Sequence, residues 1–111
     1  MRREVPSLAQ IDAVFAALSH EARRHILLLL SHYGGELPSG YLAKRLPHSW
    51  PTTTRHLGVL EKAGLVEVRR EGRGSHYRIN RDYLLRITGR WLDNLQPPTP
   101  RQTWEPKGRR K

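Results

Sequence analysis

The chain has 111 residues, enough for one small domain with a modest core, and it contains no cysteine. The lack of cysteine excludes disulfides, thiolate metal ligands, thiol redox sensing and cysteine nucleophiles. Lysine and arginine total 20 against 10 acidic residues, and the resulting net charge of +10 favours an anionic partner, most commonly nucleic acid.

Two helices are expected in the N-terminal third of the chain. Ser7 and Gln10 have the spacing of a capping box, and apolar residues follow at helical spacing as far as Leu18. Ser19 can cap a second helix that ends at the glycine pair 34–35. The apolar run of this second helix is too continuous for a surface helix, so the helix is expected at the centre of the core.

Two further helices are separated by a break. A short third helix begins at residues 38–39, and Pro47 ends it. Ser49 can cap a fourth helix, since Pro51 is tolerated in a first turn, where backbone amides lack helical partners. Gly64 can adopt the left-handed conformation at its end, with the next leucine packing back in a Schellman motif.

The segment after the fourth helix predicts a β-hairpin. LVEVRR and SHYRIN alternate apolar and polar residues, and EGRG between them supplies a turn. A fifth helix is expected from about Arg81 to Leu95. The following residues contain four of the eight prolines of the chain and no helical or strand period, which is typical of a flexible basic tail.

The order of these elements is that of a winged helix-turn-helix, a mainly α fold with a small β-hairpin between the fourth and fifth helices. Residues 1–96 would form a DNA-binding and dimerisation domain, and residues 97–111 the tail. The fourth helix, about residues 49–63, would be the recognition helix, with Thr53, Leu57 and Leu60 facing inward.

The start of the fourth helix, WPTTTRH, is poor for packing alone, because β-branched residues cost helix propensity. It suits a helix whose first turns meet base edges in the major groove. Arg55 can bind a guanine, Thr54 a thymine methyl group and His56 a phosphate. The arginines of the hairpin, about residues 69–78, suit a wing on the flanking groove or backbone. The expected DNA-binding residues are Ser39, Ser49, Trp50, Thr52, Thr54, Arg55, His56, Arg69, Arg73 and Arg78.

Over residues 17–80 the chain resembles the ArsR/SmtB family of bacterial winged-helix repressors. The resemblance lies in ALSHEARRHILLLL, in LAKRL and in SWPTTTRHLGVLEKAGLV. It implies five helices with a wing after the fourth, a homodimer built from the first and last helices, and repression of the protein's own operon through a palindromic operator.

The fifth helix has two apolar stripes, one more than a single small core needs. This supports a dimer independently, although both stripes could also be buried within one subunit. The candidate dimerisation residues are Leu8, Ile11, Phe15, Leu84, Ile87, Trp91 and Leu95.

The chain departs from the family at its metal sites. Many members bind metals through thiolates on the third helix or through Asp and His on the last, yet ELPSGYLAKRL has no thiol and RDYLLRITGRWLDNL no histidine. His25 and His32 are two helical turns apart, which favours packing or surface roles over a shared ion. We therefore expect no metal and no cofactor. Trp50 stands where the family often has glutamine, so base readout should depend on Thr54 and Arg55.

The leading hypothesis is a homodimeric, sequence-specific transcriptional repressor that binds double-stranded DNA. Alternatives are a nonspecific architectural DNA-binding protein and, less well supported, a protein-interaction module. The sequence shows no serine–base pair and no glycine-rich phosphate loop that would indicate an enzyme. The apolar run Ile26–Leu30 is too short to span a membrane, and no signal core precedes it, so a cytoplasmic protein is expected. The sequence leaves any effector or partner protein undefined.

Overall fold

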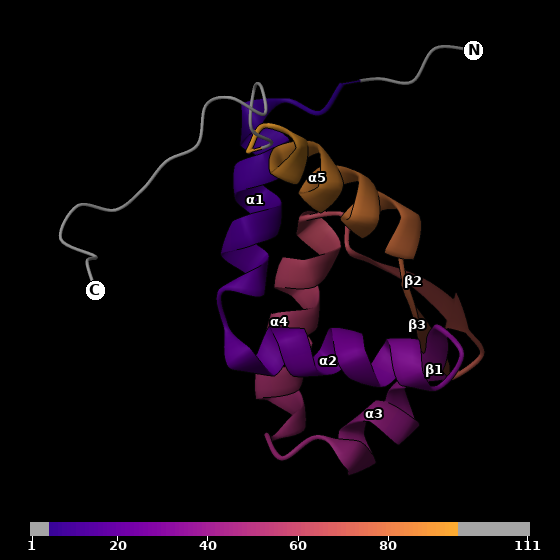
Figure 1. Cartoon of the computed structure of the whole chain (residues 1–111). Coiled ribbons are helices and arrows are strands. Elements are labelled where there is room, and N and C mark those ends of the chain that lie inside the picture. Colours follow the sequence, from indigo (N-terminus) through magenta and orange to yellow (C-terminus); the bar gives the residue numbers. More distant parts are fainter. Residues whose placement is uncertain (1–4, 96–111) are drawn as a thin grey trace, which may run out of the picture.

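The computed structural model describes residues 5–95. Its helices are α1 (Leu8–Leu18), α2 (Glu21–His32), α3 (Ser39–Arg45), α4 (Trp50–Lys62) and α5 (Arg81–Asp93). Its strands are β1 (Glu36–Pro38), β2 (Val66–Glu71) and β3 (Gly74–Ile79). In Figure 1, α2 crosses in front of α4. Helix α3 lies below α2, α5 lies above α2 near the top of α1, and the sheet lies at one side. The predicted mainly α fold with a wing is confirmed.

The sheet has three antiparallel strands in the order β1-β3-β2. The predicted hairpin corresponds to β2 and β3, and the third strand, β1, was not predicted. Gly34 and Gly35, with φ of 90° and 96°, turn the chain from α2 directly into this strand. The amide of Ile79, the last residue of β3, donates to the carbonyl of Gly35, the residue before β1, at 2.8 Å. A three-residue edge strand that ends in Pro38 has too little alternation to be found in a sequence.

The predicted helix ends are confirmed at α1 and α4 and corrected at α2. Ser7 and Gln10 form the capping box, and the amide of Leu65, after Gly64, donates to the carbonyl of Leu60 at 2.9 Å. Ser19 does not cap α2, because its hydroxyl donates back to the carbonyl of Ala16 at 2.7 Å. His20 caps α2 instead, its Nδ1 accepting from the amide of Ala22 at 3.0 Å.

The core gathers buried residues from every helix and strand around α2 and α4. As expected, α2 is central, with Ile26 and Leu30 almost fully buried. Its apolar run does not point inward throughout, since Leu28 keeps 69% of its surface exposed. On α4 the inward stripe is confirmed, with Thr53, Leu57 and Leu60 buried.

Thr53 is a buried position at which a substitution is expected to stabilise the protein. Its side chain is 1% exposed, and its hydroxyl has no hydrogen-bond partner among the described residues. Because an unsatisfied buried hydroxyl costs about 1–3 kcal/mol, we expect Thr53→Val, which keeps the shape, to raise the free energy of unfolding by about 1 kcal/mol. Urea unfolding measures the change, and an unaltered affinity for DNA is the control. A loss of stability would show that the hydroxyl has a partner, such as a buried water.

Candidate nucleic-acid interface

The exposed N-terminal turns of α4 form the first part of the candidate interface. Ser49 caps the helix: its Oγ accepts from the amide of Thr52 at 3.3 Å and donates to the Thr52 hydroxyl at 3.1 Å. These two predicted DNA-binding hydroxyls therefore already serve the cap. Pro51 lies in the first turn, which contains no acidic residue, so the positive end of the helix dipole is left uncompensated there.

Thr54 and Arg55 are both exposed on α4, Thr54 at the flank of the buried stripe and Arg55 opposite it. Among residues 5–95, Arg55 has no hydrogen-bond or ion-pair partner, so its guanidinium donors are available. Trp50, the first residue of the helix, is 36% exposed. Ser39 begins α3 and is half-buried. The front of α4 thus presents a short hydroxyl, a free arginine and part of an indole.

His56 does not stand free on this front, although the sequence placed it toward a phosphate. It is half-buried, with Nδ1 3.2 Å from Nη1 of Arg23 and its ring centroid 4.4 Å from that of His20. The ring of His48, in the turn before α4, lies 6.1 Å away. The first half of α4 is thereby joined to the start of α2.

Arg23 is a residue that sequence reasoning missed. Its Nε donates to the carbonyl of Ala17 at 2.7 Å, while Nη1 reaches His56. One guanidinium therefore links the last turn of α1, the first turn of α2 and α4. Its place in the EARR segment was visible, but nothing in the sequence indicated which side chain it would contact.

The histidine cluster makes stability depend on pH. Partial burial, His20, Arg23, His48 and Arg55 together lower the pKa of His56 from its ordinary value of 6.5. Since the unfolded chain then binds a proton more readily than the folded one, stability is greatest above pH 6.5 and falls as the pH drops through 6.5 toward the lower folded pKa.

We expect the free energy of unfolding, measured in urea, to fall between about pH 7.5 and about pH 5.5. The free energy of unfolding of His56→Gln, which retains an acceptor for Arg23, should fall less over the same interval. His25→Gln is the matched control, because His25 is exposed on α2 and lies outside the cluster. Equal pH slopes for wild type and His56→Gln would contradict this role of the cluster.

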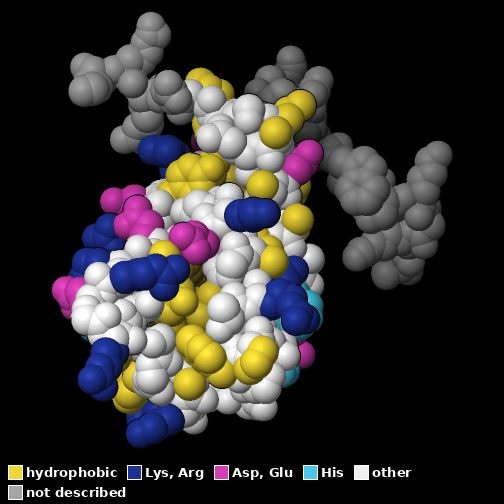
Figure 2. All heavy atoms as spheres, turned by 180° about the vertical axis from the view of Figure 1, so that it is seen from behind, with side chains coloured by type: hydrophobic (Ala, Val, Ile, Leu, Met, Phe, Trp, Pro, Cys, Tyr) yellow, Lys and Arg dark blue, Asp and Glu magenta, His cyan; other side chains and the backbone are white. Residues whose placement is uncertain are grey.

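The outward face of the wing is nearly charge-balanced. Arg69 pairs with Glu36 at 2.7 Å and with Glu71 at 3.2 Å, and Arg78 pairs with Glu67. A hydrogen bond from each arginine to its glutamate raises the pKa of both guanidinium groups. Figure 2 shows the result on the side of the molecule that holds the sheet, where acidic and basic side chains alternate.

Two of the four arginines counted in the sequence as wing charges are therefore engaged within the protein. Arg70 makes only a 3.3 Å hydrogen bond to the hydroxyl of Ser75. Arg73 lies exposed at the tip, after Gly72, and has no partner within residues 5–95. The positive charge available to a partner is thus concentrated at the tip of the wing rather than along both strands.

The second surface of interest runs along α1 and α5. Leu8, Trp91 and Leu95 of the predicted dimerisation set are 78%, 40% and 60% exposed. Ile11 and Ile87 are instead buried in the core of the protomer. Two leucines of α5 outside the predicted set are exposed instead: Leu85 at 60% and Leu92 at 51%.

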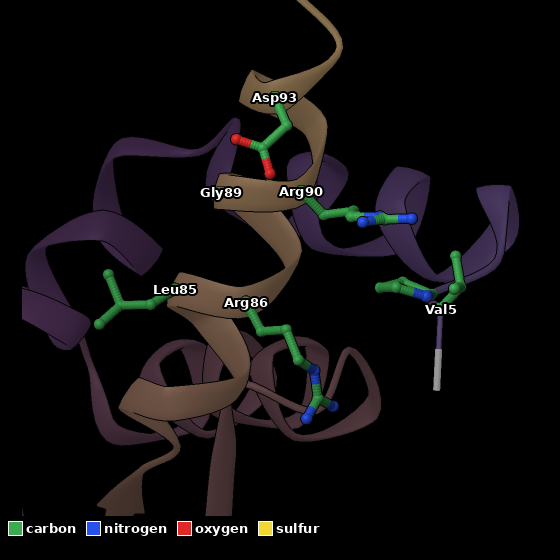
Figure 3. Close-up of a pocket in the computed structure, with 7 residues that line it drawn as sticks. Val5, Leu85, Arg86, Gly89, Arg90 and Asp93 are labelled. Carbon is green, nitrogen blue, oxygen red and sulfur yellow. The ribbon is translucent and has the colours of Figure 1, made fainter. Parts of the chain in front are cut away.

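Gly89 of α5 borders a hollow of about 360 Å³ between this helix and Val5, and Arg86, Arg90 and Asp93 also line it (Figure 3). Phe15 and Leu84 are half-buried, and the ring of Phe15 meets that of Trp91 edge-on at 5.1 Å. The two helices therefore pack together, and leucines of both helices and Trp91 remain exposed on them.

Within residues 5–95 there is no group of three or more His, Asp or Glu side chains placed to hold a metal ion. No helix in the same range is long and apolar enough to cross a membrane.

A short helix, a tight turn, a polar-fronted second helix and an antiparallel wing define a winged helix-turn-helix protein. A family model described as a helix-turn-helix domain matches residues 18–69. The transcriptional repressor SdpR of Bacillus subtilis is 35% identical over 85 residues, which are 77% of this chain and 91% of that protein. The biofilm growth-associated repressor of Agrobacterium fabrum is 33% identical over 78 residues, and the match covers 70% of this chain but 65% of that relative.

Solved structures agree. An ArsR-like transcriptional regulator from Rhodococcus sp. RHA1 has a TM-score of 0.67 and 38% identity, covering 78% of this chain and 79% of that one. A homodimeric winged helix-turn-helix domain from Mycobacterium bovis, described as a possible ArsR-family regulator, has a TM-score of 0.63 and 32% identity over 79% and 78% of the two chains. The chain belongs to the ArsR family of transcriptional regulators, and it is not an enzyme.

Proposed function

We propose that the protein is a homodimeric repressor that binds a palindromic operator, with α4 in the major groove and the tip of the wing on the flanking groove or backbone. The observation that carries this proposal is Arg55, which is exposed and has no partner within residues 5–95, beside Thr54 on a helix whose other side is anchored in the core. A helix so oriented presents an arginine fork and a short hydroxyl, which are groups that read base edges.

Dimerisation is supported by the outer face of α1 and α5. Its exposed leucines and Trp91 form the kind of apolar patch that a monomer rarely keeps. Gly89 has no side chain and open space beside it, so a second helix could approach α5 closely at this point (Figure 3). A two-fold dimer would place two copies of α4 about 34–36 Å apart, on successive major grooves of one duplex face.

The DNA upstream of the protein's own gene offers the direct test, because the family resemblance implies autorepression. In gel shifts at about 150 mM salt, we expect affinity for that DNA to exceed affinity for a scrambled duplex of equal length by about 1,000-fold. Strong binding to both duplexes with nearly equal affinity would support the architectural alternative instead.

The predicted tail, residues 97–111, lies outside the described residues, and its sequence carries five basic side chains against Glu105. We expect its deletion to lower affinity for every duplex and to reduce the dependence of affinity on salt, since fewer phosphate charges are neutralised. Binding of specific and random duplexes over a salt series measures both effects. A changed site preference after deletion would contradict a purely electrostatic contribution.

A further inference from the structure

A second pocket, of about 440 Å³, lies between α2 and the first half of α5, away from the front of α4. Its walls are almost entirely apolar, and they come from the end of α1, from α2, from the end of β3 and from α5. The apolar residues that line it are Leu18, Leu27, Leu28, Ile79, Leu84 and Leu85. Its volume lies within the range of small-molecule sites.

The floor and the rim of this pocket differ. Leu27 and Ile79 are buried in the core, so the floor is fixed by the fold. In the protomer Leu28 of α2 and Leu85 of α5 are 69% and 60% exposed at the mouth, and Leu85 is shared with the α1–α5 surface proposed for the dimer. An occupant with an apolar body would cover both leucines, and the burial of such surface supplies the main favourable free energy of binding.

The polar groups of the pocket are cationic. Arg24 and Arg81 line it together with Ser31, and no carboxylate is among its lining residues. Arg24 donates from Nη1 to the carbonyl of Leu18 at 2.8 Å, and Arg81 donates from Nη2 to the hydroxyl of Ser31 at 2.9 Å. Each guanidinium is thus positioned by a neutral group, and each retains further donors for an anion.

The two cations lie toward opposite ends of the pocket. Arg24 and Ser31 are seven residues apart on α2, so Ser31, which binds Arg81, stands two turns or about 10.5 Å along the same face. Any ligand that lies along this face therefore has an arginine within reach of its charged end in either orientation.

We propose that this pocket binds a small organic anion with an apolar body, such as a medium-chain or aromatic carboxylate, and that the ligand weakens DNA binding. The effector role rests on the proposed function, whereas the binding site does not. The pocket lies between two packed pairs, α5 on α1 and α2 on α4. An occupant that moves α5 relative to α2 would change the spacing of the two recognition helices in a dimer, and such coupling is reciprocal.

The first experiment measures ligand binding without DNA. Decanoate is titrated into the full chain, with decanol and decyltrimethylammonium as probes of equal chain length but different charge, and leucine methyl resonances are followed by NMR. We expect saturable shifts of the pocket leucines with decanoate, weaker shifts with decanol and none with the cation. Arg81→Gln should weaken decanoate binding about three- to tenfold and leave decanol unchanged, while Lys62→Gln, which removes the same charge outside the pocket, should alter neither.

Three results would overturn the site: no saturable shifts, equal shifts with all three probes, or pocket leucines that shift with protein concentration instead of ligand. The last result would mean that a second copy of the chain fills the pocket. Leu28→Trp, which replaces an exposed residue at the mouth, should block decanoate without unfolding the protein, as checked by its thermal transition.

The second experiment separates the site from the function. Decanoate should lower affinity for the DNA upstream of the protein's own gene at least fivefold in the wild type and have no such effect in Leu28→Trp. Binding of decanoate with no effect on DNA affinity would overturn the effector role. If decanoate binds but no duplex is preferred over a scrambled one, the proposed function fails and the site stands. If a duplex is preferred but decanoate does not bind, the inference fails and the proposed function stands.

Discussion

Replacement of Arg55 by alanine is expected to lower affinity for the specific operator by about 10- to 100-fold, which corresponds to the loss of one bidentate contact to a guanine. Affinity for random DNA should fall by only a few-fold, since only one phosphate-attracting charge is removed. The selectivity of the loss follows from the position of Arg55, which is exposed on the front of α4 and has no acidic partner within residues 5–95.

The matched control for Arg55→Ala is Arg73→Ala at the tip of the wing. If the tip contacts phosphates, this variant should weaken specific and random binding by similar factors and reduce the salt slope by about one. Parallel gel-shift titrations of the two variants on operator and random DNA, repeated over a salt series, measure the losses in affinity and the salt slope. Equal losses on operator and random DNA for Arg55→Ala would show that this residue does not read a base.

Leu92→Glu is expected to convert the dimer into monomers and to lower operator affinity by more than about 100-fold. The side chain is 51% exposed on α5, so the change leaves the core of the protomer intact. In a two-fold dimer it would bury two carboxylates within an apolar interface, where unpaired charges are strongly unfavourable. Each monomer would then hold a single half-site and lose the gain in affinity from binding both.

Leu28→Glu is the control for this result, because Leu28 is similarly exposed but lies on α2 rather than on the surface of α1 and α5. Light scattering coupled to size exclusion reports the mass of each variant, and gel shifts report operator affinity. A dimeric Leu92→Glu with unchanged DNA binding would remove this face from the interface. A monomeric Leu28→Glu would move the interface to α2.

Local sequence patterns predicted much of this fold because the determining interactions are themselves local. The capping box of α1 spans Ser7 to Gln10, and the Schellman turn at Gly64 closes within a few residues. The orientation of α4 followed from the spacing of Thr53, Leu57 and Leu60, which places them on one helical face. These features require no knowledge of the rest of the chain.

The contacts that could not be predicted join residues far apart in sequence. Glu36 and Arg69 are 33 residues apart and meet only because the short strand β1 brings the glutamate to the sheet. The same separation divides Arg23 from His56. A count of arginines in the wing therefore overestimated its free charge, and no local pattern indicated that His56 would contact α2.

The ligand pocket had no sequence signal either. Leu28 belongs to an apolar run that favoured full burial, and Leu85 to the apolar stripe of the fifth helix that was not among the predicted dimerisation residues. Their exposure on opposite sides of one mouth depends on how α5 lies against α2, which is a property of the assembled domain. Arg24 and Arg81, distant in sequence, become neighbours of the same pocket for that reason.

Selection of bound sequences from random DNA, with the purified protein at about 150 mM salt, tests the central claim most directly, because this salt concentration suppresses nonspecific backbone binding. A homodimer that reads DNA through α4 should enrich a palindrome with half-sites centred about one helical turn apart. Arg55→Ala should lose that enrichment at one position of each half-site. Retained DNA without any enriched motif, or a single motif without two-fold symmetry, would contradict a dimeric, sequence-specific repressor.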